Sequence, residues 1–209
     1  MKKLIKIIFF SFGRLFSSKL VYCVINSYSS IIMYIYTGYQ SRKFYHFGEN
    51  SLISRGFITK YPQLICIGNN VYIDEYSEIT AWLNKENDKT TPVIKIGNNT
   101  IVRKFAHITA VDKIIIGENV LIGPNVLITD NSHGILDKTQ SQLHPSLRPI
   151  YSKGPVIIGD NVWIGEKASI MPGVTIGKSV IIAANSVVTK SIPDNSMVAG
   201  VPAKIIKQI

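Results

Sequence analysis

Histidine is the residue type in this chain best suited to acid–base chemistry, because a neutral imidazole with an ordinary pKa of about 6.5 accepts a proton near neutral pH. The 209 residues include four histidines, and two of them, His133 and His144, lie close together. The two cysteines, Cys23 and Cys66, are far apart, so the sequence has neither a Cys-x-x-Cys zinc motif nor a disulfide framework. The candidate catalytic groups are therefore imidazoles, and the fold must position them.

A six-residue repeat predicts the elements that position these histidines. Aliphatic residues return every six positions in groups of three hexads. The groups are Ile67, Ile73 and Ile79; Ile96, Val102 and Ile108; Ile116, Ile122 and Ile128; Ile158, Ile164 and Ile170; and Ile176, Ile182 and Val188. Extra residues follow Ile79, Ile108 and Ile128, always after three complete hexads. We therefore expect an all-β prism of about five triangular coils, with aliphatic side chains inside and parallel strands about 4.8 Å apart.

The longest interruption of the repeat, residues 129–155, is the candidate active-site loop. It contains His133 and His144, flanked by Arg148 and Lys153. A long insertion on a regular prism is usually functional, because the repeat itself does not need it for stability.

The first 60 residues differ in composition from the repeat that follows. Residues 1–48 contain seven basic residues and no acidic one, out of a net charge of +10, together with most of the aromatic residues. We expect a mostly helical basic and aromatic segment over residues 1–60, and the repeat domain over residues 61–209. Three roles are open for the segment: packing on the rest of the protein or a neighbouring subunit, contact with an anionic membrane surface, and nucleic-acid binding.

Neither a membrane span nor a secretion signal explains the N-terminal segment well. The charge-free run Leu20–Ser41 contains several polar residues, which makes it a poor bilayer-crossing helix. Lys6 and Arg14 interrupt the apolar stretch that a signal peptide would need. Between the two binding roles, we favour peripheral membrane contact through residues 1–48 over nucleic-acid binding. Packing on the rest of the protein or on a neighbouring subunit stays open as the third role.

Three longer sequence stretches resemble a known family. They are "NSHGI", "GDNVWIGEKASIMPGVTIG" and "NSVVTKSIPDNSMVAGVPAKIIK". They resemble the hexapeptide-repeat acyltransferases, and within them the sugar O-acetyltransferases that include the maltose and galactoside enzymes. The wording around "SHGI" and "SLRPI" is most similar to the branch that acetylates lipopolysaccharide and capsule sugars. The resemblance implies a left-handed parallel β-helix, a homotrimer with active sites between subunits, and acetyl-CoA as co-substrate without a metal.

The resemblance also implies roles for individual residues. His133 matches the family's catalytic base, which takes the proton of a sugar hydroxyl as the oxygen attacks the thioester of acetyl-CoA. On the acceptor side, Phe105 stands at the position of the family's sugar-binding asparagine. Three further candidates come from their place in the sequence and not from the resemblance: His107, which would face outward below the excursion, and Asp130 and Asn131, which could orient the imidazole or contact substrate. The coenzyme side falls on Trp163, Glu166, Ala184, Thr189, Lys190, Lys204 and Lys207.

The expected function is an acetyl-CoA-dependent O-acetyltransferase of a surface polysaccharide or its lipid-linked precursor. We expect it in the cytoplasm, with a peripheral position on the cytoplasmic face of the inner membrane as the more specific hypothesis. The alternatives are an N-acetyltransferase of an amino sugar nucleotide, which uses the same base and coenzyme, and a non-catalytic β-helix scaffold. A zinc carbonic anhydrase on the same fold is disfavoured, because the closest histidine pair, His133 and His144, lies on a loop.

Overall fold

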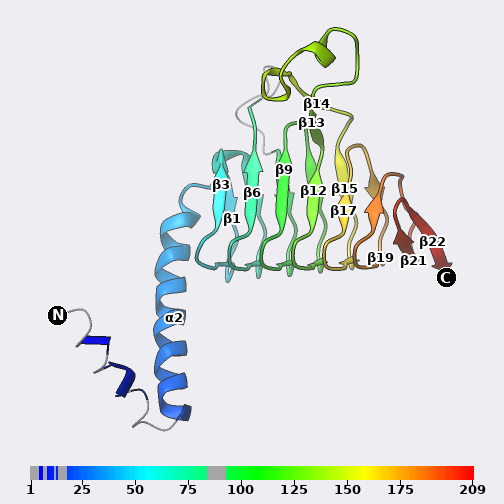
Figure 1. The fold of residues 1–209 in the computed structure, drawn as a ribbon. Coiled ribbons are helices and arrows are strands. Elements are labelled where there is room, and N and C mark those ends of the chain that lie inside the picture. The colour runs from blue at the N-terminus through cyan, green and yellow to red at the C-terminus, as the bar shows by residue number, and fades with distance from the viewer. Residues whose placement is uncertain (1–4, 7–8, 12, 14–17, 84–92) are drawn as a thin grey trace.

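The chain folds as a prism of short parallel strands preceded by one long helix (Figure 1). The computed structural model describes residues 5–6, 9–11, 13, 18–83 and 93–209. The basic residues Lys2, Lys3 and Arg14, which the membrane hypothesis invokes, lie outside these ranges.

Three sheets form the sides of the prism, with parallel pairing throughout except between the last two strands, β21 and β22. Apart from these two and the β13–β14 pair, successive strands of the chain belong to successive sheets. Sheet A consists of β1 (His46–Phe47), β4 (Ile65–Ile67), β7 (Ile94–Ile96), β10 (Ile114–Ile116), β15 (Val156–Ile158) and β18 (Thr175–Ile176). Sheet B consists of β2 (Leu52–Ile53), β5 (Tyr72–Ile73), β8 (Ile101–Val102), β11 (Leu121–Ile122), β16 (Trp163–Ile164), β19 (Ile181–Ile182), β21 (Ser196–Gly200) and β22 (Ala203–Gln208). Sheet C consists of β3 (Ile58–Lys60), β6 (Glu78–Ala81), β9 (His107–Ala110), β12 (Leu127–Thr129), β17 (Ser169–Ile170) and β20 (Val187–Val188).

The strand register matches the hexad repeat of the sequence. In sheet A, for example, Ile67 pairs with Ile96, Ile96 with Ile116, and Ile116 with Ile158. The same holds for the hexad residues of sheets B and C, and all fifteen are at most 2% exposed. A fully buried isoleucine contributes roughly 1.5–3 kcal/mol relative to an exposed one. The core is therefore three stacks of aliphatic side chains.

Asparagines form the corners between sheets A and B. Asn70, Asn99 and Asn119 have φ angles of 55°, 57° and 56°, in the left-handed region that asparagine tolerates better than most residues. Their side chains also bond to one another along the prism, from Asn70 Nδ2 to Asn99 Oδ1 (3.1 Å) and from Asn99 Nδ2 to Asn119 Oδ1 (3.2 Å). The corner residues thus join consecutive coils as well as turning the chain.

The prism begins earlier in the chain than the repeat predicts. Strands β1, β2 and β3 pair with β4, β5 and β6, so residues 46–60 form a coil ahead of the predicted ones. The expected helical segment over residues 1–60 therefore differs from the structure, in which the helix α2 covers Ser18–Ser41. The aliphatic pattern does not reveal this coil, because Phe47 and Thr59 occupy the positions equivalent to Ile67 and Ile79.

The C-terminal half of α2 covers the first coil. Thr37 Oγ1 donates to the carbonyl of Ile53 (3.2 Å) and accepts from the Ile53 amide (2.9 Å), and both residues are buried. Tyr36 donates from its hydroxyl to the carbonyl of Phe57 (3.3 Å). The helix thereby satisfies backbone groups of β2, an edge strand that could otherwise pair with another chain.

The three interruptions of the repeat all lie where the chain passes from sheet C back to sheet A, as the sequence predicts. The longest leaves the prism after β12 as an excursion that projects from one edge (Figure 1). It contains an antiparallel pair, β13 (Asn131–His133) and β14 (Ile150–Ser152), and the 3₁₀ turns η2 (Gln140–Gln142) and η3 (Pro145–Leu147). A third 3₁₀ turn, η1 (Pro62–Leu64), precedes β4.

Candidate active site

A groove of about 580 Å³ runs along sheet B, beside the corner that leads to sheet C. Trp163, Glu166 and Ala184, three of the residues proposed to contact coenzyme, all line it. They come from two consecutive coils, because Trp163 on β16 pairs with Ile181 on β19. The structure thus brings this part of the predicted site together.

Small residues form one side of the groove because the backbones of neighbouring coils approach closely there. Gly123, Gly165 and Ala183 occupy equivalent positions, each donating its backbone N–H to the coil that follows. A Cβ on Gly165 would lie 2.6 Å from the amide nitrogen of Ala184, and one on Gly123 would lie 2.8 Å from that of Glu166. A side chain at either glycine would therefore force the backbone of the next coil to move.

Apolar side chains form the other side of the groove. Leu121, Trp163, Ile181 and Met197 follow one another across sheet B in register. Trp163 is 52% exposed, so its ring is accessible from the groove. The groove can therefore accept a long, flexible ligand with both apolar and amide groups.

Two of the predicted coenzyme lysines lie at the C-terminal end of this groove. Strand β22 pairs antiparallel with β21, so that Lys207 lies opposite Met197 and Lys204 opposite Ala199. Both lysines are exposed. They could reach an anionic group that extends beyond Met197.

The other two predicted coenzyme residues, Thr189 and Lys190, lie on a different edge of the prism. They follow β20 of sheet C, at the same edge from which the excursion leaves after β12. Both are exposed. Within one chain they are separated from the groove by the width of sheet C.

His133 lies on the excursion and is exposed. It ends β13 and pairs with Ile150 of β14, while Gly134, at φ 77°, turns the chain away immediately afterwards. A Cβ at Gly134 would lie 2.5 Å from Gln140 Oε1, so the loop packs tightly behind the histidine. The hairpin therefore presents the His133 imidazole to solvent at the sheet C–sheet A edge, away from the groove of its own chain.

Asp130 has a structural position that the sequence does not predict. Its side chain is fully buried, and its carboxylate accepts from the backbone amides of Val111 (2.9 Å), Asp112 (2.8 Å) and Lys113 (2.8 Å). Asn131 Nδ2 also donates to it, at 3.0 Å. Contrary to the expectation of a substrate contact, Asp130 is enclosed in the protein, where it holds the preceding corner and the start of the excursion together.

Asn131 shares this structural environment. Its Nδ2 donates to the carbonyl of Thr109 (3.2 Å) as well as to Asp130, and its backbone amide donates to Thr129 Oγ1 (3.2 Å). The side chain amide is thus directed toward the prism. Asn131 begins the strand that His133 ends, so its contacts attach this strand to the fixed corner.

The two remaining acceptor candidates lie on neighbouring surfaces. His107 is on the outer face of sheet C, half-buried, with Nε2 3.7 Å from Glu78 Oε1. Phe105 is at the corner between sheets B and C, where its ring stacks on that of Tyr76 at 5.6 Å and 11°. Both residues have left-handed backbones, at φ 61° for Phe105 and 56° for Tyr76, which is unusual for aromatic side chains.

Sequence reasoning missed several residues of the groove, including Arg103, Pro124 and Met197. A signal for part of it exists, because a glycine or alanine follows the hexad aliphatic at Ile122, Ile164 and Ile182. Small residues at one repeat position over three consecutive coils indicate a surface that something approaches closely. Among the described residues, no group of histidine, cysteine and carboxylate side chains is arranged to hold a metal ion.

Comparisons with known proteins show which family this arrangement belongs to. Residues 155–190 match the family model "Bacterial transferase hexapeptide (six repeats)", and residues 113–135 match "Hexapeptide repeat of succinyl-transferase". The solved structure of a maltose O-acetyltransferase from Clostridium difficile 630 is 31% identical, with a TM-score of 0.52, over 80% of this chain and 71% of that chain. The chain belongs to the hexapeptide-repeat acetyltransferase family.

Two further proteins similar to this chain are a relative named for lipopolysaccharide biosynthesis and a structure solved with a coenzyme. It is 40% identical over 119 residues to the putative lipopolysaccharide biosynthesis O-acetyl transferase of Escherichia coli K12, which is 56% of this chain and 61% of the relative's length. A hexapeptide-repeat-containing acetyltransferase from Vibrio cholerae O1 biovar eltor was solved with acetyl coenzyme A. It is 28% identical, with a TM-score of 0.58, over 81% of this chain and 73% of that one. The fold is accordingly the left-handed parallel β-helix that the resemblance implies.

Proposed function

We propose that this protein transfers the acetyl group of acetyl-CoA to a sugar hydroxyl of a surface glycan or its precursor. His133 is the general base in this proposal: its imidazole takes the hydroxyl proton while the oxygen attacks the thioester carbonyl. The tetrahedral intermediate then collapses to the acetyl ester, the C–S bond breaks, and the proton passes to the coenzyme thiolate. The exposure of His133 supports this role, because an acceptor can reach the ring.

The groove on sheet B supports acetyl-CoA as the donor. Its apolar row with Trp163, opposite the small residues Gly165 and Ala184, suits a slender pantetheine arm. Lys207, beyond Met197, could pair with the phosphates at the adenosine end. We propose that the thioester lies toward the Trp163 side of the groove.

The position of His133 supports an assembly of several chains. His133 and Lys190 lie at one edge of sheet C, whereas the groove lies at the opposite edge. In a homotrimer, the loop of one protomer can face the groove of the next, so that each active site uses two chains. The exposed side chains of Trp163 (52%), Leu136 (97%) and Leu147 (72%) provide apolar surface for such contacts.

The decisive experiment measures acetyl transfer and coenzyme binding for His133→Ala beside the unaltered protein. We expect transfer to a polysaccharide precursor to fall by roughly 10²–10⁴-fold, the usual contribution of a general base. Binding of coenzyme A is expected to be unchanged, because His133 is proposed to act on the acceptor hydroxyl and is not a lining residue of the groove. Retention of transfer would remove His133 from its role, and failure of the unaltered protein to bind coenzyme A would contradict the function itself.

We also propose that α2 contacts an anionic membrane surface on the cytoplasmic side. The face of α2 turned away from the prism exposes Val24 (61%), Ile31 (57%), Ile35 (69%) and Tyr39 (64%). Arg42 and Lys43 follow the helix and are exposed, so basic groups stand next to the apolar face as in interfacial helices. In the described part of the chain, no helix has the length and apolar character to span a bilayer.

Vesicle sedimentation tests the membrane contact with the double variant Ile31→Ser and Ile35→Ser. We expect the unaltered protein to bind vesicles containing phosphatidylglycerol more strongly than vesicles of phosphatidylcholine alone, and the variant to lose this binding. Ile58→Ser, an exposed position on sheet C, is the matched control. The proposal would be contradicted if the variant bound vesicles as strongly as the unaltered protein, whether or not its oligomer had dissociated.

A further inference from the structure

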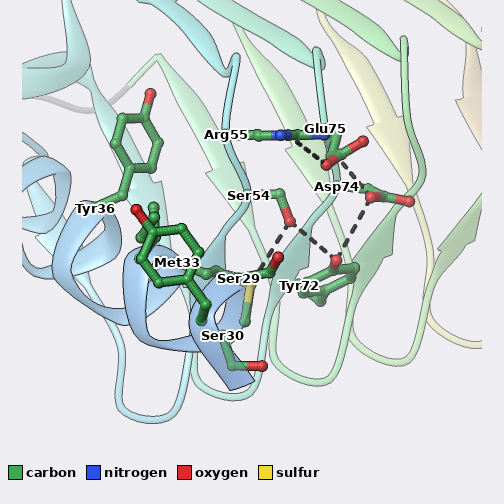
Figure 2. A pocket seen from close by; sticks show the side chains of 11 residues that line it. Ser29, Ser30, Met33, Tyr36, Ser54, Arg55, Tyr72, Asp74 and Glu75 are labelled. Atoms are coloured by element: carbon green, nitrogen blue, oxygen red, sulfur yellow. Dashed lines mark hydrogen bonds and ion pairs between the residues drawn. The ribbon is translucent and has the colours of Figure 1, made fainter. Parts of the chain in front are cut away.

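A second cavity, which we call the α2 cleft, lies between α2 and the corners that follow β2 and β5 (Figure 2). Its volume is about 350 Å³, within the range of small-molecule sites. The helix contributes Ser29, Met33 and Tyr36, and the prism contributes Ser54 and Tyr72. The cleft is distinct from the sheet B groove, which is lined by different residues.

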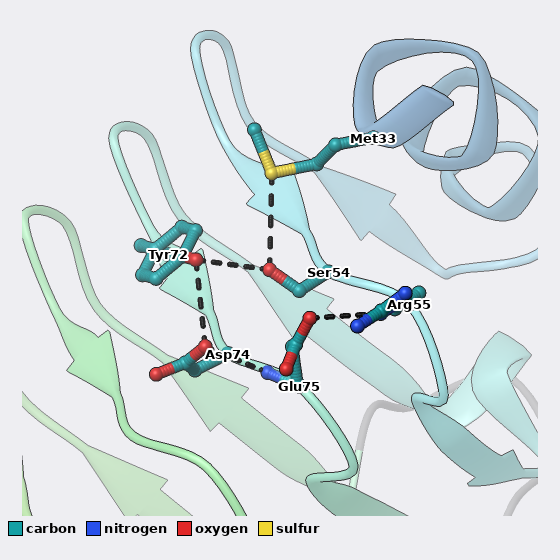
Figure 3. A network of polar contacts seen from close by, with 6 residues as sticks. All are labelled: Met33, Ser54, Arg55, Tyr72, Asp74 and Glu75. Carbon is teal, nitrogen blue, oxygen red and sulfur yellow. Dashed lines mark hydrogen bonds and ion pairs between the residues drawn. The ribbon is translucent and has the colours of Figure 1, made fainter. Parts of the chain in front are cut away.

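A chain of polar contacts crosses the floor of the α2 cleft and is weak at both ends (Figure 3). The hydroxyls of Ser54 and Tyr72 are 2.9 Å apart. Beyond them, Ser54 Oγ lies 3.8 Å from the sulfur of Met33 and the Tyr72 hydroxyl lies 3.5 Å from Asp74 Oδ1, and the two hydroxyl hydrogens can supply only two of these three contacts. Sulfur is a poor acceptor and 3.5 Å is long for a hydroxyl donor, so a ligand hydroxyl would improve both contacts.

Each carboxylate of the α2 cleft has an arginine partner, one inside the cleft and one beside it. Arg55 Nε lies 2.9 Å from Glu75 Oε1, and Arg103 Nη1 lies 3.6 Å from Asp74 Oδ2. Among the described lining residues, the two carboxylates outnumber the one arginine, and Arg103, outside the cleft, offsets the second carboxylate, so the lining does not favour an anion such as phosphate. It favours a neutral ligand with many hydroxyl groups.

The remaining lining of the α2 cleft adds flat apolar surface next to these polar groups. Tyr28, Tyr36 and Tyr72 each have an apolar ring and a hydroxyl at its tip, and Ile32 lies among them. A pyranose has the complementary form, with C–H groups on its faces and hydroxyls around its rim. The combination of rings, carboxylates and hydroxyls thus fits a sugar better than it fits an apolar or a charged molecule.

The α2 cleft is continuous with the row of positions that leads into the groove. The backbone N–H groups of Ser54, Asp74 and Arg103 each donate to a carbonyl of the coil that follows. Those of Gly123 and Gly165 do the same further along the prism. Arg103 lines the groove and pairs with Asp74 of the cleft. At about 4.8 Å per coil, Asp74 and Gly123 are only about 10 Å apart along the prism.

We propose that the α2 cleft is an acceptor subsite that binds a neutral sugar unit of the glycan being acetylated. This inference rests on the proposed function. It also makes the acceptor an oligosaccharide rather than a single sugar, because one unit lies in the cleft while another extends along the prism toward the acetyl donor. The helix α2 then serves both to cap the prism and to form one wall of the subsite.

The test measures binding of neutral oligosaccharides built from glucose, galactose or N-acetylglucosamine, with the corresponding monosaccharides beside them, to the full-length protein. Ser29→Trp fills the cleft from the helix side, and Ser27→Trp, at an exposed position of α2 outside the cleft, is the matched control. Tyr72→Phe removes one hydroxyl of the network and keeps the ring. Coenzyme A binding is measured for every variant.

We expect at least one oligosaccharide to bind, and Ser29→Trp to weaken that binding at least about tenfold while Ser27→Trp changes it less than about twofold. Tyr72→Phe is expected to weaken it to an intermediate extent, with coenzyme A binding unchanged throughout. Binding of none of the oligosaccharides, or equal binding by the two tryptophan variants, would overturn the subsite while leaving the acetyltransferase proposal standing. Failure of the unaltered protein to bind coenzyme A would instead refute the proposed function.

Discussion

At the scale of single residues, the carboxylate of Asp130 determines how the excursion is attached to the prism. It binds three consecutive backbone amides of the preceding corner and lies three residues before His133. Because the carboxylate is fully buried, water does not readily take its place as the acceptor for these amides. The catalytic proposal therefore depends on a side chain that itself does not touch substrate.

Replacement of Asp130 by alanine tests this dependence. The variant removes the buried carboxylate that accepts from the amides of Val111, Asp112 and Lys113, and we expect the free energy of unfolding to fall by about 3 kcal/mol. Urea denaturation measures the loss. Asp130→Asn, which keeps the size and one acceptor oxygen, should lose less, and equal stability of the alanine variant would show that the corner is held by other contacts.

Asp160 makes the stability of the prism depend on pH. The backbone amide of Glu118 donates to its carboxylate, Lys178 Nζ donates to it as well, and these contacts lower the pKa of Asp160 below its ordinary value of 3.8. A carboxyl group with a lowered pKa in the folded state stabilises the protein above the unfolded-state value. That contribution is lost as the pH falls through the folded-state pKa.

Asp160→Asn is therefore expected to melt at a lower temperature than the unaltered protein at pH 7. The difference in melting temperature should shrink as the pH falls below 3.8, because the unaltered carboxyl group then becomes neutral too. Differential scanning calorimetry over this pH range measures it. A difference that stays constant down to the lowest pH would show that the loss does not come from the charge of Asp160.

At the scale of elements, α2 closes an end that the repeat leaves open. A stack of parallel coils has an exposed edge on its first strands, and terminal elements that cover it are required for solubility. Thr37 meets this need by bonding both the amide and the carbonyl of Ile53. The same helix supplies one wall of the α2 cleft, so its attachment affects function as well as stability.

Thr37→Val keeps the shape of the side chain and removes the hydroxyl. We expect it to lower the free energy of unfolding by about 1–3 kcal/mol, because the buried amide and carbonyl of Ile53 lose their partner. Hydrogen exchange at the Ile53 amide should accelerate more than exchange in β16. Thr37→Ser restores the hydroxyl and should restore protection, and unchanged exchange in the valine variant would contradict the capping role.

At the scale of the whole molecule, the proposed active site needs two chains, and mixed oligomers can test this. Chains with His133→Ala lack the base, and chains with Ala184→Trp have a blocked groove. If each site combines the base of one chain with the groove of another, equal coexpression should restore about a quarter of the full activity. No recovery in oligomers shown to be mixed would place both parts of the site in a single chain.

The number of chains is checked by sedimentation velocity. A homotrimer has three times the chain mass of 23.2 kDa. We expect the mass of the trimer at micromolar concentration both for the unaltered protein and for His133→Ala, since the histidine is exposed. A monomeric protein with full activity would refute the two-chain site.

The sequence alone determined the register of the prism. Each coil must place an aliphatic side chain inside at the same three positions, so the six-residue period is visible in the order of residues, and Ile67 through Val188 are paired as that period requires. Interruptions could be located for the same reason, because a coil must close before and after them. The motifs around His133 and Trp163 likewise identified the family.

Only the tertiary structure decided what these elements bring together. The first coil was hidden because Phe47 and Thr59 replace aliphatic residues, and the partners of Asp130 are amides 17 to 19 residues away in the chain. The separation of His133 from the groove depends on the width of sheet C, and the α2 cleft depends on where the helix packs. Such contacts follow from the packing of distant segments, which leaves no periodic trace in the sequence.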